Sequence, residues 1–326
     1  MEQHEQTPSA PAAPAYEPDP RRWRVLTVSL LVGFMSLLDV TIVNVAVPSI
    51  RAGLDTSAAT VQWVVSGYAL AFGMTLVAGG RLGDAHGRRR MMTLGLVGFI
   101  VSSAAVGLAP NAAAIVVARL AQGASAGLLT PQNSGLVQQL FRGEERGRAF
   151  GMFGFTVAVA SATGPLIGGL LIGLLGEENG WRSLFLVNVP IGLVALVMVR
   201  RLVPDSVDRG GGDPRIDVPG ALLLGLTVVA VLFPLISLEA GAGVPLVLLA
   251  AVPVLAWAFV RWEQRTVRRG HPPVLDVSLL RTLPGYANGL LVGTLYFTGF
   301  TGIFLVLSVH LQEGAGLTPL SAALLL

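Results

Sequence analysis

The segment GRLGDAHGRRR, from Gly80 to Arg90, decides how this sequence folds. It combines three glycines, one acid and four arginines, and it lies between two long apolar stretches. A segment this short is not a domain. It can join two membrane helices on the cytoplasmic side, where an excess of arginine is expected. Its glycines allow a sharp turn, and Asp84 could accept hydrogen bonds from a helix N-terminus or pair with Arg88. The alternative is a plain tight turn whose charges only set the topology.

The composition is that of a membrane protein. Of 326 residues, 53% are hydrophobic and only 13% are charged, whereas soluble domains carry about twice that charged fraction. Apolar runs of about 20 residues recur, and this length crosses about 30 Å of hydrocarbon as a helix. A β-barrel would show short alternating segments instead. We therefore expect an all-α polytopic membrane protein. It has no cysteine, and its scattered histidines indicate no metal site.

The arginines orient the predicted spans. With the N-terminus in the cytoplasm, 19 of the 22 arginines fall in cytoplasmic segments, including residues 81–90, 139–149 and 262–283. This asymmetry predicts a multi-pass protein of the cell inner (plasma) membrane with a cytoplasmic N-terminus. The predicted spans are 25–48, 60–80, 91–109, 112–134, 150–174, 184–203, 217–237, 244–261 and 285–311, with another beginning near Pro319 and cut off at the end of the sequence.

Asp39 is the strongest candidate for a functional residue. If Pro48 marks the outer end of the first span, Asp39 lies about 13 Å below that surface. Burial disfavours the charged form of a carboxyl group, so such a residue can exchange protons near neutral pH. The alternative is an acid at a frayed helix end. Asn44, in the same span, could bind a substrate or equally make a polar contact between helices.

Arg119 lies at about the same depth in the fourth span, about 12 Å below the same surface. An acid and a base at equal depth predict a functional pair with Asp39. The alternative is a structural ion pair with no role in proton transfer.

The fifth span carries a stripe of small residues. Ala160, Gly164 and Gly168 recur every four residues, which favours close packing of that face against another helix. Pro165 lacks a backbone N–H and should kink the helix. Ordinary helix packing is the simpler explanation for the glycines, but the full spacing, which starts at Gly151 and ends at Gly169, is more specific.

These stretches together resemble the major facilitator superfamily. They are most similar to its 14-helix drug–proton antiporter branch, the EmrB/QacA-like exporters. LDVTIVNVAVP is similar to that branch's first-helix motif, GRLGDAHGRRR to motif A, ARLAQGASAG to motif B, and GFTVAVASATGPLIGG to the antiporter motif C. VQWVVSGYAL, WRSLFLVNVPIG and RIDVPGALLL also match its pattern. The resemblance covers residues 23 to 326.

The resemblance assigns roles to these residues. Asp39 would be the proton or cation site, with Arg119 as the coupling arginine. Motif A would form a cytoplasmic gate, with Asp84 and Arg88 as its lock. Motif C would bend the fifth helix for exchange. The gate residues are Gly80, Gly83, Asp84, Gly87 and Arg88, and the antiporter motif consists of Gly151, Ala160, Gly164, Pro165, Gly168 and Gly169.

The resemblance also implies a domain organisation. It predicts two helical halves with two additional helices between them. Because the family branch has fourteen spans, we interpret the chain as C-terminally truncated, about eight residues into its tenth span. The units are a disordered cytoplasmic tail (1–22), an N-terminal six-helix half (23–203), a cytoplasmic connector (204–216), two additional transmembrane helices (217–261), a cytoplasmic loop (262–283) and the start of the C-terminal half (284–326).

The function implied is proton-coupled export of drugs or other amphipathic small molecules, that is, multidrug efflux and antibiotic resistance. The expected partners are the substrate, protons and the lipid bilayer, with no nucleic acid and with the proton gradient in place of a cofactor. Two alternatives stay open: a transporter of the same fold for a specific metabolite, and a non-transporting membrane fragment. An enzyme is not expected, because no phosphate-binding loop, nucleophile elbow or other catalytic constellation is visible.

Overall fold

The computed structural model describes residues 18–176, 180–205, 217–239 and 247–314. Most of the predicted tail (1–22), most of the connector (204–216) and the span beginning near Pro319 lie outside these residues. Within them, the regular structure is helical and contains no strand, as predicted.

The helices follow the apolar runs of the sequence. In chain order they are α1 (Arg22–Gly53), α2 (Ala58–His86), α3 (Arg88–Gly107), α4 (Ala112–Leu140), α5 (Gly143–Leu175), α6 (Gly180–Leu186), α7 (Asn188–Leu202), α8 (Val218–Glu239), α9 (Val247–Arg268), α10 (Leu279–Thr282), α11 (Tyr286–Val309) and a π-helical turn, η2 (His310–Gly314). The first residues of α2 and α4 follow Ser57 and Asn111, whose side chains accept the N–H groups of Thr60 (3.2 Å) and Ala114 (2.9 Å) as N-caps.

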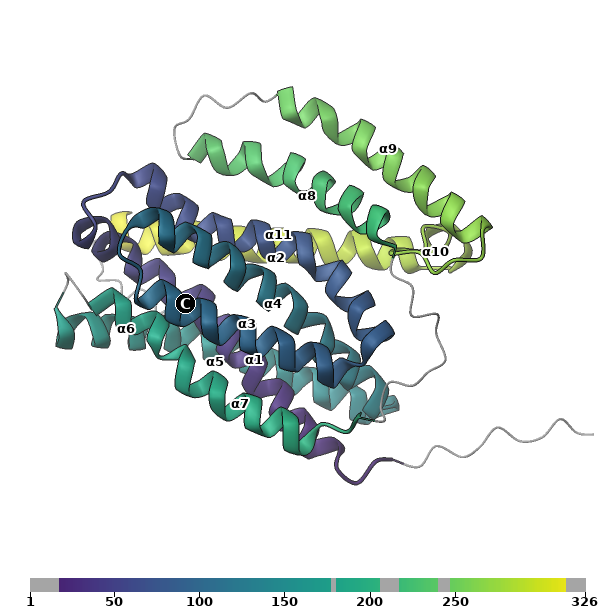
Figure 1. Cartoon of the computed structure of the whole chain (residues 1–326), viewed down its shortest axis with the longest axis horizontal. Coiled ribbons are helices and arrows are strands. Elements are labelled where there is room, and N and C mark those ends of the chain that lie inside the picture. Colours follow the sequence, from purple (N-terminus) through teal and green to yellow (C-terminus); the bar gives the residue numbers. More distant parts are fainter. Residues whose placement is uncertain (1–17, 177–179, 206–216, 240–246, 315–326) are drawn as a thin grey trace, which may run out of the picture.

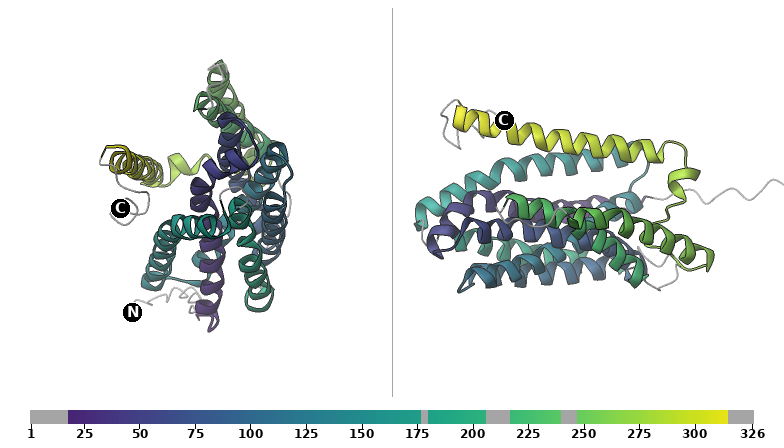
Figure 2. Two further views of the ribbon diagram at one scale, coloured as in Figure 1. Left: turned by 90° about the vertical axis from the view of Figure 1, so that its left-hand side faces the viewer. Right: turned by 90° about the horizontal axis from the view of Figure 1, so that it is seen from above.

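Seven spans in the described residues are long and apolar enough to cross a membrane. They are α1 to α5, the combined α6 and α7, and α8. The predicted spans at 244–261 and 285–311 coincide with α9 and α11, and their crossing of the membrane stays a prediction. Figure 2 shows α11 apart from the bundle formed by the earlier helices.

Helix α1 runs through the bundle, between α5 on one side and α4 and α7 on the other (Figure 1). Its buried face belongs to two apolar clusters. One surrounds Val25 to Met35 together with residues of α3, α4 and α7. The other surrounds Ile42 to Ile50 together with residues of α2, α3, α4 and α6. Asp39 lies between the two clusters and is fully buried. The fold therefore places a carboxyl group where water cannot solvate it.

Glycines bring α2 and α4 into direct backbone contact. A Cβ atom at Gly123 of α4 would collide with the backbone of Tyr68, and one at Gly79 of α2 would lie 2.8 Å from the carbonyl oxygen of Gly127. Small residues permit this approach, and close packing is a main source of helix association in lipid. This contact fixes the position of the residues that precede Gly123 on α4, Arg119 among them.

Helices α8 and α9 pack against each other, and α8 also packs along α2 (Figure 1). The Trp63 and Phe233 rings meet with centroids 5.5 Å apart. Val228 of α8 lies against Gly73 of α2. The two additional helices are therefore part of the same bundle as α2.

The segments that connect the spans are shorter than the sequence predicted, because the helices extend into them. The segment from Gly80 to Arg90 is almost entirely helical, because α2 continues to His86 and α3 begins at Arg88. Gly87 alone joins them, with φ of 95°, a conformation that favours glycine. Likewise, residues 139–149 contain only a short break between Leu140 and Gly143, and α9 extends to Arg268, within the predicted loop 262–283. Arginine, glutamate and glutamine are good helix formers, so these helices continue past the apolar runs.

Pro48 does not mark the end of the first span. It lies inside α1, which continues to Gly53. A proline removes one backbone hydrogen bond and can be tolerated in a membrane helix when neighbouring helices support it. Asp39 therefore lies further from the end of its helix than the sequence predicted.

The contact between α2 and α4 can be tested with a pair of glycine substitutions. Gly123→Ala should lower the thermal stability of the purified chain, because its methyl group would collide with the backbone of Tyr68. Gly147→Ala in α5 has open space around its Cβ position, so the higher helix propensity of alanine should raise stability by up to about 1 kcal/mol. Melting curves in detergent give both values. Equal effects of the two substitutions would contradict the close approach of α2 and α4.

Candidate functional site

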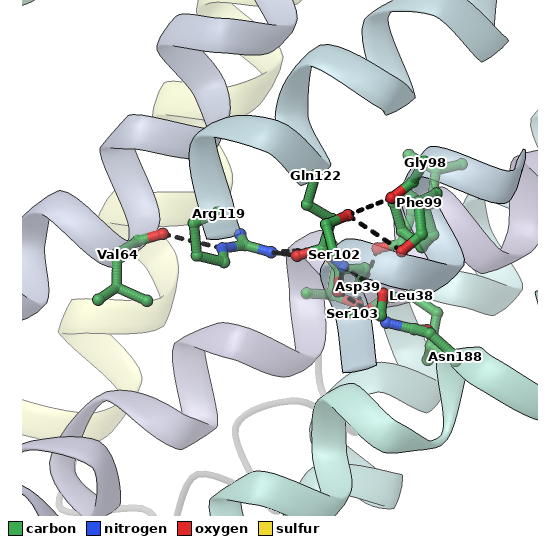
Figure 3. A network of polar contacts seen from close by, with 12 residues as sticks. Leu38, Asp39, Val64, Gly98, Phe99, Ser102, Ser103, Arg119, Gln122 and Asn188 are labelled. Carbon is green, nitrogen blue, oxygen red and sulfur yellow. Dashed lines mark hydrogen bonds and ion pairs between the residues drawn. The ribbon is translucent and has the colours of Figure 1, made fainter. Parts of the chain in front are cut away.

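The site is a buried network centred on Asp39 (Figure 3). Arg119 of α4 donates from Nη1 to Oδ2 of Asp39 at 2.6 Å. The exposed fractions of the two side chains are 1% for Arg119 and 0% for Asp39. The structure thus brings together the acid and the base that the sequence paired by depth. A buried ion pair of this kind persists only when further hydrogen bonds satisfy both partners.

Two carboxamides complete the hydrogen bonding of Asp39. Gln122 Nε2 donates to its Oδ1 at 2.9 Å, and Asn188 Nδ2 donates to the same oxygen at 2.7 Å. Gln122 also donates to the hydroxyl of Ser103 at 2.7 Å. Asp39 therefore accepts hydrogen bonds from α4 and α7 through three donors.

The guanidinium group of Arg119 has partners besides Asp39. Its Nε donates to the carbonyl oxygen of Val64 at 2.9 Å, and its Nη1 donates to Oε1 of Gln122 at 2.8 Å. The Tyr68 ring lies 4.3 Å from its central carbon, within the range of a cation–π interaction. The cation is therefore held to α2 independently of the carboxylate.

Asn188 lies at an interruption of the sixth span. Helix α6 ends at Leu186 and α7 begins at Asn188. Pro190 follows in the first turn of α7, where its missing N–H costs least. The carboxamide of Asn188 is fully buried, and its Oδ1 has no hydrogen-bond partner among the described residues. This side chain links the start of α7 to Asp39.

Motif A packs against α4. Arg88 donates to Asp84 at 2.6 Å, one helical turn apart across Gly87. The guanidinium of Arg88 lies over Gly135, where a Cβ atom would collide with it. Gly83 makes room for the Gln132 side chain in the same way, and Gly80 lies against Pro131. The structure therefore joins the predicted gate residues to one another and to α4, and their role as a gate stays a prediction.

The antiporter motif divides into two groups. Ala160, Gly164 and Gly168 are the buried residues of its stripe. Gly164 lies against Thr41 of α1, whose hydroxyl donates to the carbonyl oxygen of Ala160 at 3.2 Å. Gly168 lies against Val45 of the same helix. The predicted close-packing face therefore contacts α1, the helix that carries Asp39.

The other members of the motif lie away from that contact. Nothing within 4 Å would meet a Cβ atom at Gly151 or Gly169. Pro165 lies inside α5, which is continuous around it, and the predicted kink stays a prediction.

Asn44 lies outside the network. It is exposed on α1. The structure does not bring it to Asp39 or Arg119, and its role in binding a substrate stays a prediction.

The sequence analysis missed several residues of the network. Gln122 lies three residues after Arg119 and so occupies the same helix face. Asn188 is an amide in the middle of an apolar run, and amides at such positions commonly hydrogen-bond across helices. These two signals are visible in the sequence. The contributions of Ser103, Tyr68 and the carbonyl of Val64 depend on tertiary packing and have no comparable signal.

The network and the bundle define a class of protein, the polytopic α-helical membrane proteins with a buried ion pair at the centre of one helical bundle. Residues 29–326 match the Major Facilitator Superfamily, and the chain belongs to that family. Among solved structures, it is similar to a bacterial homologue of the human lysosomal transporter Spinster, with a TM-score of 0.55 and 20% identity over 94% of this chain and 71% of the other. That likeness concerns the fold alone.

The chain is also similar to curated proteins of Streptomyces. The chain is 40% identical over 310 residues to a probable actinorhodin transporter of Streptomyces coelicolor, covering 94% of this chain and 53% of the relative. It is 33% identical over 322 residues to a tetracenomycin C resistance and export protein of Streptomyces glaucescens, covering 98% of this chain and 58% of the relative. The chain thus spans little more than half the length of these relatives.

The ion pair predicts a specific pattern of stability changes. Arg119→Met should lower the free energy of unfolding by about 3–5 kcal/mol, because it leaves the carboxylate of Asp39 buried without its cation. Adding Asp39→Asn to Arg119→Met should recover much of this loss, because the unpaired charge is then removed. Unfolding of the purified chain in detergent measures both effects.

The control is Arg51→Met, at an exposed arginine near the end of α1. It should change stability by no more than about 0.5 kcal/mol. Strictly additive losses for Arg119→Met and Asp39→Asn would show that the two side chains do not act as a pair.

Proposed function

We propose that the chain functions as a proton-coupled antiporter that exports antibiotics or other amphipathic small molecules across the plasma membrane. The observation that carries the proposal is the buried network of Asp39. Ionisable residues inside membrane spans are expensive to bury and commonly mark ion or substrate pathways. The names of two curated relatives, a probable actinorhodin transporter and a tetracenomycin C resistance and export protein, support the direction and the substrate class.

Protonation of Asp39 would weaken the hydrogen bonds and the ion pair that connect α1 to its neighbouring helices. The ionised carboxylate accepts from Arg119, Gln122 and Asn188. A neutral carboxyl group loses the charge that attracts Arg119 and weakens the other two bonds, since bonds to an ionised acceptor are roughly twice as strong. Arg119 would keep its bonds to Val64 and Gln122. A proton would therefore loosen α1 from α4 and α7, which is a physical basis for coupling proton binding to helix movement.

The end of the bundle that carries Gly87 would face the cytoplasm. The same end carries the starts of α1, α5 and α8 and the ends of α4, α7 and α9, and most of the arginines lie there. The positive-inside rule supports this orientation. Proton entry from the outside would then be coupled to substrate exit from the cytoplasm. Movement of the α1–α5 contact during exchange is the proposed role of the antiporter motif.

A second candidate is export of one specific cell product. The names of two relatives each refer to one compound, actinorhodin and tetracenomycin C, and this favours a specific exporter. Both candidates assign the same role to Asp39. They differ in breadth: a specific exporter should respond to one group of closely related compounds, and a multidrug exporter to chemically unrelated dyes and antibiotics.

The proposal predicts that Asp39→Asn abolishes the coupling of transport to the proton gradient. In everted vesicles from cells that express the gene encoding this chain, proton-driven transport should fall to background. Exchange of labelled for unlabelled substrate without a proton gradient should persist, because it requires no net proton movement. Asp55→Asn is the matched control, an exposed acid just after α1 that should leave both activities unchanged. Undiminished proton-driven transport in Asp39→Asn would contradict the proposal.

A further inference from the structure

A pair of carboxyl groups, those of Asp217 and Glu263, lies where α8 and α9 meet, at the end of the bundle that carries Gly87. Asp217 precedes α8 and accepts the backbone N–H of Gly220 at 2.9 Å, as an N-cap does. The indole of Trp262 on α9 donates to both of its oxygens, at 2.8 and 2.9 Å. The hydroxyl of Thr266 donates to Oδ2 at 3.3 Å. These donors hold the carboxyl group of Asp217 between the start of α8 and α9.

Glu263 of α9 lies beside Asp217 under very different conditions. It is fully buried, and it lies beyond the predicted span 244–261. Its Oε2 accepts a long hydrogen bond from the backbone N–H of Leu275, at 3.4 Å, and the backbone N–H of Val274 also favours its ionised form. Its Oε1 has no hydrogen-bond partner among the described residues. A buried carboxylate oxygen without a donor is costly, so this position favours a neutral carboxyl group.

The two carboxyl groups face a common point. A Cβ atom at Gly220 would lie 2.5 Å from Oδ2 of Asp217 and 2.6 Å from Oε1 of Glu263. The two oxygens are therefore separated by no more than the sum of those distances. Glycine at this position leaves the space into which the unpartnered oxygen of Glu263 points.

The charges around Glu263 come from two neighbouring helices. Asp217 of α8 repels a second negative charge, and Arg81 of α2 attracts it. Burial is the largest influence and raises the pKa of Glu263 from an ordinary 4.5 to about 7, with Asp217 adding to the rise and the backbone N–H of Leu275 and Arg81 opposing it. A group with this pKa changes its charge within the physiological range of pH.

We propose that Glu263 is a second proton-binding site, separate from Asp39 and built by the two additional helices. With the proton bound, Glu263 is neutral beside the ionised Asp217. Release of the proton to water leaves two carboxylates facing one another, and the new charge also faces Arg81 of motif A. The site would thereby make the packing of α9 against α8 depend on the pH at this end of the bundle.

Trp262 provides a reporter for the site, because its indole donates to Asp217 and it neighbours Glu263 in the chain. Tryptophan fluorescence of the purified chain should change with a midpoint near pH 7 when it is titrated from about pH 5 to about pH 9. Trp262→Phe should abolish the change and so assign it to this residue. Glu263→Gln, which keeps the shape of the side chain but cannot ionise, should also abolish it.

Glu144→Gln is the matched control, the same substitution at an exposed acid near the start of α5. It should leave the titration unchanged. Absence of a transition over this range, or a transition that persists in Glu263→Gln, would overturn the proposal.

Thermal stability gives a second measurement that does not depend on fluorescence. A raised pKa in the folded chain means that the folded state holds the proton more tightly than the unfolded state. The stabilisation is complete below about pH 4.5 and is lost as the pH rises to about 7. The melting temperature of the wild-type chain should therefore fall over this interval relative to Glu263→Gln. Parallel pH profiles for the two proteins would contradict the proton site.

Discussion

A negative charge buried between two apolar clusters is the constraint on which the rest of this structure depends. Asp39 lies between the cluster that includes Met35 and the one that includes Ile42, with none of its surface exposed. Such a charge is stable only when a cation and several donors satisfy it. Arg119, Gln122 and Asn188 meet this requirement. They come from helices on one side of α1, which therefore must converge at this level.

Close packing of the helices allows α4 and α7 to converge on Asp39. The backbone contact at Gly123 sets α4 close enough to α2 for Arg119 to reach the carbonyl of Val64 as well as Asp39. On the other side of α1, Gly164 and Gly168 let α5 approach the turns that follow Asp39. Small residues and the buried charge are thus parts of one arrangement. A change in the protonation of Asp39 would act on contacts between helices that have little space to adjust.

The sequence was sufficient for the helical class and for the pairing of Asp39 with Arg119, because long apolar runs and intramembrane charges are strong signals. The sequence did not predict where the helices end. Gly80 to Arg90 looks like a loop, yet only Gly87 leaves the helix, since arginine and alanine continue a helix readily in water. Hydropathy reports where the apolar run stops, and a helix often continues beyond that point.

The sequence also could not assemble the rest of the network. Ser103 and Tyr68 have no distinctive signal in the sequence. They join the network around Asp39 only because their helices cross there. Asn44, a polar residue near Asp39 in sequence, is exposed instead, because five residues correspond to a rotation of about 140° around a helix. Helix periodicity therefore places Asn44 outside this network, and its contact with a substrate stays a prediction.

Proton release on ligand binding tests the central claim most directly. The claim is that the carboxyl group of Asp39 exchanges a proton as the protein binds its substrate. When tetraphenylphosphonium, a lipophilic cation, binds to the purified protein in weakly buffered detergent at a pH acidic enough to protonate Asp39, the account predicts release of up to about one proton per bound cation, by reciprocal linkage between the two ligands. Asp39→Asn should bind the probe and release none. Equal proton release from the wild-type protein and Asp39→Asn, or binding to the wild-type protein with no release at all, would contradict the account.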